Sequence, residues 1–231
     1  MNILMAGAGR LGRQAISVLA AAGNDVTVIE ADDELAEALR AEFSGRGVRV
    51  LFGDACDPQV LEEAGCLRAD AVVAVTGDDE DNLVIGLLAK RQFQVPRVVA
   101  RVNDPENGWL FDQAWGVDAA VSAPLTLMSL IEEATRAADT VGLMRLSAAG
   151  VVLIETTLTK SSVATGKAVS QIPLPPGSQV AAVIRGGEPK VPDGSFKLAA
   201  GDEILIVSES ATETDVRALF QDNNPSGSPR P

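Results

Sequence analysis

A glycine-rich segment near the start of the chain limits its fold more than any other feature. The segment is Gly7-Ala8-Gly9-Arg10-Leu11-Gly12, which matches the pattern G-x-G-x-x-G. It directly follows the aliphatic run Asn2–Ala6 and opens a helix-like stretch, and Glu30 stands at the end of the next aliphatic run. A strand, a glycine turn, a helix and a later acidic residue together predict a dinucleotide-binding unit.

Each glycine has a separate expected task. Gly7 permits the tight turn, Gly9 lets the backbone approach a pyrophosphate, and Gly12 allows the helix to pack closely on the strand. The helix N-terminus offers unpaired N–H groups to the phosphates. Glu30 can accept hydrogen bonds from ribose hydroxyls and would repel a 2′-phosphate, which favours NAD(H) or unphosphorylated adenosine over NADP(H). The alternative is a structural glycine turn beside a solvated glutamate.

Short aliphatic runs alternate with helical stretches through the first part of the chain, a pattern that indicates a parallel sheet. The runs lie at Asn2–Ala6, Asp25–Glu30, Val48–Phe52, Ala71–Val75, Arg97–Arg101 and Ala119–Val121. Helices are expected to begin near Arg10, Asp33, Asp57, Asp79 and Asp104. We therefore expect an α/β fold with a Rossmann-type doubly wound parallel sheet over residues 1–141.

The pattern changes after Val141. Strands are expected at Val151–Thr159, Gln179–Arg185 and Glu203–Val207, followed by a helix at Thr212–Phe220. These elements predict a smaller α+β domain over residues 142–220. Residues 221–231 have the composition of a disordered tail.

A helix is expected over Pro124–Asp139, with an apolar face formed by Leu127, Leu130, Ile131 and Ala134. This face requires a cover. It packs either on the sheet of its own domain or on the same helix of a second subunit, and the sequence leaves both possibilities open.

Several polar residues are expected to line a ligand site, because ligands of open α/β sheets bind at the carboxyl ends of the strands. Gly53-Asp54-Ala55-Cys56 follows the third run, and Thr76-Gly77-Asp78 follows the fourth. Arg10 can neutralise phosphate charge or remain solvated. The acidic run Asp78–Asp81 fits the first turn of a helix better than a metal site, because adjacent carboxylates on one helix seldom converge.

Composition excludes several classes of function. A net charge of −13 argues against a general nucleic-acid binder, and no apolar run is long enough to span a bilayer. The start of the chain carries no secretory signal pattern, so a cytoplasmic protein with two reduced, structural cysteines is expected. The chain has no histidine and no tyrosine, which are common acids and bases in dehydrogenases. The nucleotide is therefore expected to be sensed rather than transformed, with an oxidoreductase or a stand-alone nucleotide sensor as the alternatives.

Taken together, these motifs resemble the TrkA family of potassium-conductance regulators. The resemblance is carried by GAGRLG, Glu30, GDA at Gly53–Ala55, AVTGDDEDN at Ala74–Asn82 and ARVNDP at Ala100–Pro105. The second part resembles a TrkA C-terminal domain at Gly166-Lys167, Arg185, Pro192-Asp193 and Leu198–Glu203.

The resemblance implies a peripheral protein at the inner face of the membrane that forms a homo-oligomer, a dimer or a ring of dimers. The resemblance also implies that such a protein gates a potassium transporter or channel according to bound NAD(H) or ATP/ADP. Residues 7–11 would be the phosphate loop, Glu30 the ribose acceptor, Thr76 and Gly77 a contact at the fourth strand, and Arg101 a phosphate-facing residue. From the residues alone, a ligand contact and a salt bridge are equally expected roles for Arg101.

Overall fold

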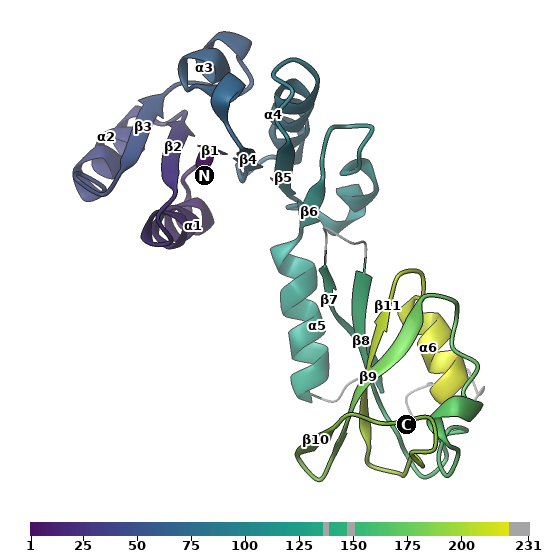
Figure 1. Cartoon of the computed structure of the whole chain (residues 1–231). Coiled ribbons are helices and arrows are strands. Elements are labelled where there is room, and N and C mark those ends of the chain that lie inside the picture. The colour runs from purple at the N-terminus through teal and green to yellow at the C-terminus, as the bar shows by residue number, and fades with distance from the viewer. Residues whose placement is uncertain (136–138, 147–150, 222–231) are drawn as a thin grey trace, which may run out of the picture. The chain divides into compact units, whose positions relative to one another are not determined.

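The computed structural model describes residues 1–135, 139–146 and 151–221. It contains two compact units, Met1–Leu125 and Thr126–Pro231 (Figure 1). The predicted tail lies outside the described residues from residue 222 onward, and so do residues 136–138 of the predicted helix Pro124–Asp139. The domain limits predicted from the sequence, 1–141 and 142–220, stay a prediction.

The first unit is built around a parallel sheet of six strands in the order β3-β2-β1-β4-β5-β6. The strands are β1 (Asn2–Ala6), β2 (Asp25–Glu30), β3 (Val48–Phe52), β4 (Ala71–Ala74), β5 (Arg97–Arg101) and β6 (Ala119–Val121). This order is that of a doubly wound Rossmann sheet, in which the direction of winding reverses between β1 and β4. The predicted fold class is confirmed.

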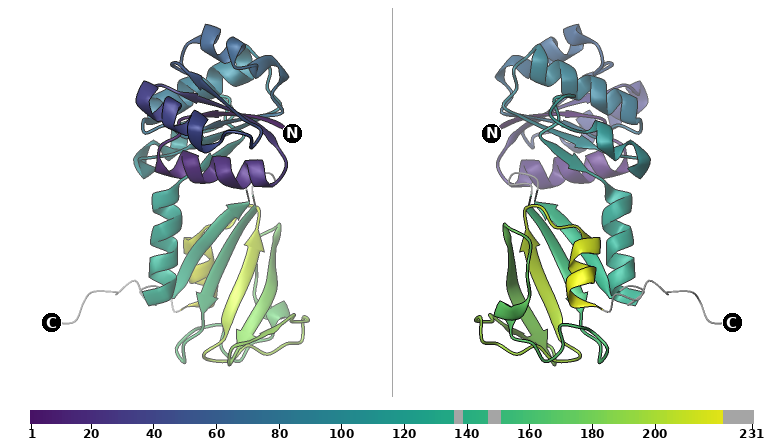
Figure 2. Two further views of the ribbon diagram at one scale, coloured as in Figure 1. Left: turned by 90° about the vertical axis from the view of Figure 1, so that its left-hand side faces the viewer. Right: turned by 90° about the vertical axis from the view of Figure 1, so that its right-hand side faces the viewer.

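Helices cover both faces of this sheet (Figure 2). They are α1 (Arg10–Ala21), α2 (Asp33–Glu42), α3 (Pro58–Glu63) and α4 (Asp79–Arg91). Alternation along β1 explains the two layers, because successive strand residues point to opposite faces. Ile3 and Met5 join the core that includes residues of α1 and α2, whereas Leu4 and Ala6 join the core that includes residues of α3 and α4.

Two predictions in the first unit need correction. The helix expected near Asp104 is a short 3-10 helix, η2 (Pro105–Leu110), in which Asp104 caps the N–H of Glu106. Gly108 in its middle disfavours a longer α-helix. Strand β4 ends at Ala74, one position before the predicted Val75, although the N–H of Val75 still donates to the Ala6 carbonyl at 2.8 Å.

The second unit contains an antiparallel sheet of five strands in the order β10-β9-β11-β8-β7. Its strands are β7 (Thr140–Leu146), β8 (Val151–Thr157), β9 (Ser178–Arg185), β10 (Glu188–Lys190) and β11 (Glu203–Ser208). Helix α6 (Glu213–Phe220) buries Val216 and Phe220 in the core of this sheet. The short 3-10 helices η1 (Cys66–Arg68) and η3 (Val169–Gln171) complete the described elements, apart from α5.

Strands β7 and β10 are absent from the sequence-based prediction. Strand β7 contains Gly142 next to a register shift against β8. The alternation of apolar and polar residues that marks a strand is therefore weak in its sequence. β10 contains Pro189 and is only three residues long. Both lie at the edges of the sheet, where such irregular sequences are tolerated.

Helix α5 (Ala123–Thr135) begins one residue before the predicted start. Its large apolar side chains are exposed: Leu127 by 60%, Leu130 by 50% and Ile131 by 46%. Among the described helices, none is long and apolar enough to cross a membrane.

Candidate functional site

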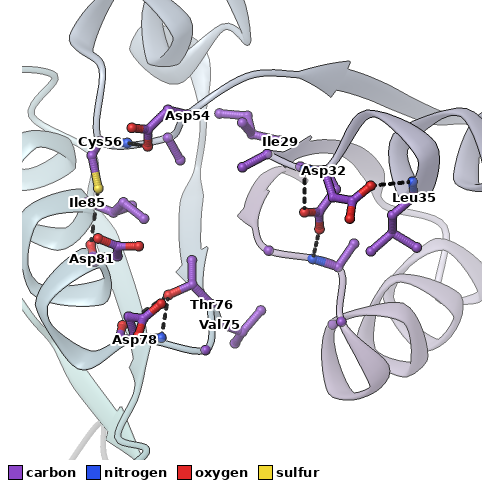
Figure 3. A pocket seen from close by; sticks show the side chains of 18 of the residues that line it. Ile29, Asp32, Leu35, Asp54, Cys56, Val75, Thr76, Asp78, Asp81 and Ile85 are labelled. Atoms are coloured by element: carbon purple, nitrogen blue, oxygen red, sulfur yellow. Dashed lines mark hydrogen bonds between the residues drawn. The ribbon is translucent and has the colours of Figure 1, made fainter.

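A cleft of about 410 Å³ lies where the strands of the first unit end (Figure 3). It is lined by the segments that follow β1, β2, β3 and β4 and by Arg101, the last residue of β5. This is the ligand edge of an open parallel sheet. The residues predicted from the sequence that line it are Gly7, Ala8, Gly9, Leu11, Gly12, Glu30, Asp54, Ala55, Thr76, Gly77 and Arg101. Residues far apart in the sequence therefore meet at one edge.

Arg10 is the predicted site residue that does not line this cleft. It lines an adjacent hollow together with Arg13, Gln14, Ser17 and Glu42. Arg13 and Glu42 form an ion pair there, with Nη2 and Oε2 2.6 Å apart. Arg10 is the first residue of α1, directly after Gly9, and it lines this adjacent hollow.

The three glycines of the motif differ in their surroundings. Gly7 has a φ of +91°, and a Cβ added there would lie 2.9 Å from the backbone of Thr76. A Cβ on Gly12 would overlap the carbonyl oxygen of Gly7. A Cβ on Gly9 would meet no atom within 4 Å. Gly7 and Gly12 are thus required by the fold itself, whereas the space beside Gly9 is open.

Glu30 is almost completely buried, with 9% of its surface exposed. Its Oε2 accepts a hydrogen bond from the Ala8 N–H at 2.7 Å, and its Oε1 accepts one from the Asp32 N–H at 3.1 Å. Bonds from N–H groups to a carboxylate are among the stronger hydrogen bonds in proteins. Glu30 therefore holds the glycine loop in place and also presents its carboxylate to the cleft, a double task that the sequence did not reveal.

A polar network fixes the ends of β4 and β5. The Oδ1 atom of Asn82 accepts from the backbone N–H of Thr76 at 2.9 Å and from its hydroxyl at 2.8 Å. The Nδ2 atom of Asn82 donates to the Arg101 carbonyl at 3.0 Å. Among the described residues, the buried Nε of Arg101 has no hydrogen-bond partner. A buried N–H without a partner is rare in folded proteins and points to a missing acceptor.

The first turn of α4 is anchored by Asp79. Its carboxylate accepts from the N–H groups of Asn103 at 2.6 Å and Asp104 at 3.0 Å, and from the side chain of Asn107 at 2.9 Å. Burial alone would raise the pKa of Asp79, but these hydrogen bonds outweigh it and lower the pKa. The acidic run is a helix N-terminal turn, and among the described residues no group of three or more metal-ligating side chains could hold an ion.

Cys56 lies at the wall formed by the segment after β3. Its backbone N–H donates to Asp54 Oδ1 at 2.8 Å, and its Sγ lies 3.9 Å from the Asp81 carbonyl oxygen. Burial, followed by the negative charges of Asp81 and Asp54, raises the pKa of the Cys56 thiol to about 12. The thiol therefore stays protonated at neutral pH and is a poor nucleophile.

The chain is similar to known protein families over both of its units. The family model of the TrkA-N domain matches residues 3–123, and that of the TrkA-C domain matches residues 153–221. The chain is 43% identical over 221 residues to the Trk system potassium uptake protein TrkA of Mycobacterium tuberculosis, covering 95% of this chain and 98% of that protein. It is 33% identical over 226 residues to a TrkA homolog of Archaeoglobus fulgidus, covering 95% of this chain and 50% of that protein.

Solved structures share the fold. The GsuK channel bound to NAD aligns with a TM-score of 0.58 at 19% identity, covering 97% of this chain and 40% of the channel chain. The TrkA-N domain of the inner membrane protein ybaL from Escherichia coli aligns with a TM-score of 0.52 at 20% identity, covering 58% of this chain and 95% of that domain. At these identities the likeness concerns the fold alone.

Proposed function

The chain belongs to the TrkA family, and we propose that it is a regulatory subunit that gates a membrane potassium transporter or channel in response to a bound nucleotide. The nucleotide, NAD(H) or ATP/ADP, occupies the cleft of the first unit and is sensed without being transformed. The protein acts at the cytoplasmic face of the membrane, where its partner holds it.

One observation carries this proposal. A protein named for potassium uptake is 43% identical to this chain and is matched over nearly its whole length, so both units are shared. The cleft is consistent with it, because the glycine loop, the helix start and Glu30 are assembled at one edge of the sheet.

In this proposal, different residues of the cleft bind different parts of the nucleotide. The loop from Gly7 to Gly12 and the start of α1 hold the pyrophosphate, and Glu30 accepts hydrogen bonds from the ribose. Thr76 and Gly77 contact the ligand past β4. Arg101 supplies a positive charge, and a phosphate oxygen would give its buried Nε the acceptor that the described residues do not provide.

Binding without turnover is the direct test. Titration calorimetry of the full chain with NAD, NADH, ATP and ADP is expected to show micromolar affinity for at least one of them. At a free ligand concentration of about 100 times Kd, the bound form gains about 2.7 kcal/mol of stability, which raises the unfolding midpoint by several degrees. If none of the four ligands shifts the midpoint, the proposal fails.

The alternative of an oxidoreductase makes a different prediction. An enzyme of that class would consume NADH in the presence of a suitable metabolite, and its chemical step would need an acid or base beside the substrate. Incubation of the chain with NADH and a metabolite panel distinguishes the two functions. Steady NADH consumption would favour the enzyme, whereas co-purification with a membrane potassium transporter would favour the regulator.

We also propose that helix α5 is an oligomerisation surface. Leu125, Leu127, Met128, Leu130 and Ile131 are all about half exposed. Such a concentration of large apolar side chains on one surface helix is unusual for a monomeric protein and is typical of an interface. A two-fold partner would bury this surface, and a second contact would close a ring.

Charges on α5 test this assembly. Light scattering on the full chain is expected to give an oligomer for the wild type and a lower mass for Leu130→Glu and Ile131→Glu, because a carboxylate buried in an apolar interface lacks a partner. Val191→Glu is the matched control, since Val191 is 89% exposed and lies outside α5. A monomeric wild type, or an oligomer unaffected by both charges, would contradict this role of α5.

A further inference from the structure

We propose that Asn82 and Asp79, at the start of α4, are positioning residues that hold Arg101 and the Thr76 segment in the geometry that binds the nucleotide. The inference rests on the nucleotide-binding function proposed above and adds the residues that keep its contacts in place. The residues that line the cleft include Thr76 and Arg101 but neither Asn82 nor Asp79, so these two act through their neighbours.

The side chain of Asn82 joins the ends of β4 and β5 beyond their last pair. The pairing of these strands ends at Ala74 and Ala100, so Thr76 and Arg101 lie past it. The Oδ1 atom of Asn82 accepts from the Thr76 N–H at 2.9 Å, and its Nδ2 atom donates to the Arg101 carbonyl at 3.0 Å. One side-chain amide therefore takes the place of a peptide group between the two strands.

This position requires a donor and an acceptor in one side chain. Asn82 is completely buried, so its hydrogen bonds are made away from water. An aspartate would offer no donor to the Arg101 carbonyl when ionised, and a leucine would offer neither a donor nor an acceptor. A buried polar group without a partner costs free energy, so the two backbone groups fix the orientation of the amide.

Asp79 holds the backbone that follows Arg101. It lies three residues before Asn82, so the two side chains share one face of α4. Its carboxylate accepts from the N–H groups of Asn103 at 2.6 Å and Asp104 at 3.0 Å, the second and third residues after Arg101. The Arg101 carbonyl and the turn after it are thus held by the same helix.

The side chain of Arg101 depends on these backbone contacts. Its buried Nε has no hydrogen-bond partner among the described residues, so that N–H does not hold the side chain against the protein. The direction in which the side chain leaves the strand then follows from the backbone that Asn82 and Asp79 hold. A side chain that already points toward its ligand loses less conformational freedom on binding. Loss of either residue is therefore expected to weaken nucleotide binding.

A double-mutant cycle between Asn82 and Arg101 tests the inference. Calorimetric titration of the full chain with NAD and with ATP is expected to show that Asn82→Leu and Arg101→Ala each lower the affinity by about tenfold. In the Arg101→Ala background, Asn82→Leu is expected to cost about threefold or less, with the remainder arising through Thr76. A loss by the same factor in both backgrounds would show a structural role alone and would overturn the inference.

Thermal unfolding separates positioning from stability. Asn82→Leu is expected to lower the unfolding midpoint equally in both backgrounds, because it leaves the same two backbone groups without a partner. Leu83→Ala is the matched control, because Leu83 is buried beside Asn82 on α4 and does not line the cleft. It should lower the midpoint through the cavity it creates and keep the affinity of the wild type. A tenfold loss of affinity in Leu83→Ala would overturn the inference.

Asp79→Asn is a second variant that keeps the shape of the side chain and one acceptor oxygen. It is expected to lower the affinity by about threefold in the wild-type background and to have no effect in Arg101→Ala. Unchanged affinity in Arg101→Ala, or in both α4 variants, would overturn the inference and leave the proposed function intact. Absence of binding of NAD and ATP by the wild type would overturn the proposed function as well.

Discussion

Gly9→Ala is expected to abolish most nucleotide binding while the protein stays folded. A Cβ at Gly9 meets no atom of the protein within 4 Å, and its φ of −55° is one that alanine adopts readily. The added methyl group would instead occupy the space into which the backbone receives a pyrophosphate. Affinity for NAD and for ATP should fall by on the order of tenfold to a hundredfold, and stability should change by less than about 1 kcal/mol.

Gly12→Ala tests the packing of the glycine loop on α1, whereas Gly9→Ala tests the approach of the pyrophosphate to the loop. Its Cβ would overlap the Gly7 carbonyl oxygen, so the loop and α1 must move apart. Overpacking of this kind costs about 1–3 kcal/mol, and binding is lost together with stability. Gly108→Ala, which adds a Cβ in open space outside the cleft, is the control for both. Wild-type affinity in Gly9→Ala, measured by calorimetry alongside thermal unfolding, would show that the pyrophosphate does not lie at this loop.

The backbone of the first unit could be predicted from local patterns. Each of these strands is a short aliphatic run, and a glycine directly follows two of them, so β1 (Asn2–Ala6), β2 (Asp25–Glu30), β3 (Val48–Phe52) and β5 (Arg97–Arg101) were located from the sequence. Their order could be inferred too, because the glycine motif specifies a doubly wound sheet.

The second unit was harder to predict. An edge strand such as β7 (Thr140–Leu146) needs neither a regular period nor a uniformly apolar face, and its bulge conceals the alternation that marks a strand. The cores of β8 (Val151–Thr157) and β11 (Glu203–Ser208) were found because each is a β-rich segment separated from its neighbours by Pro- and Gly-rich turns.

The interactions that hold the cleft together could not be read from the sequence. Asn82 joins Thr76 to Arg101, and Asp79 joins α4 to the segment after β5, across separations that no local pattern records. The motif ARVNDP carried a signal, since its Asn103 and Asp104 are the residues that bond to Asp79, but their partner became visible only in the folded chain. Arg10 shows that a residue's position in the motif does not determine which hollow it lines, because Arg10 belongs to the motif but lines the adjacent hollow.

Glu30→Arg is expected to weaken NAD binding by more than about tenfold, because one substitution removes two functions. The guanidinium cannot accept from ribose hydroxyls, and it cannot accept from the N–H of Ala8, which would lose the acceptor that now holds it at 2.7 Å. A positive charge at this place also suits a 2′-phosphate, so the affinity for NADP relative to NAD should rise.

Two smaller substitutions distinguish the loss of the loop contact from the loss of ribose binding. Glu30→Gln keeps one acceptor oxygen but no charge, so it should hold the loop or the ribose weakly and lower both the unfolding midpoint and NAD affinity. Glu30→Asp keeps the charge but is one methylene shorter, so we expect the loop contact with Ala8 to weaken and ribose binding to survive. Calorimetry with NAD and NADP, together with thermal unfolding of all three variants, measures each effect. If NAD affinity were unchanged in Glu30→Arg, the ribose would have to lie away from β2, and the assignment of Glu30 as the ribose acceptor would be wrong.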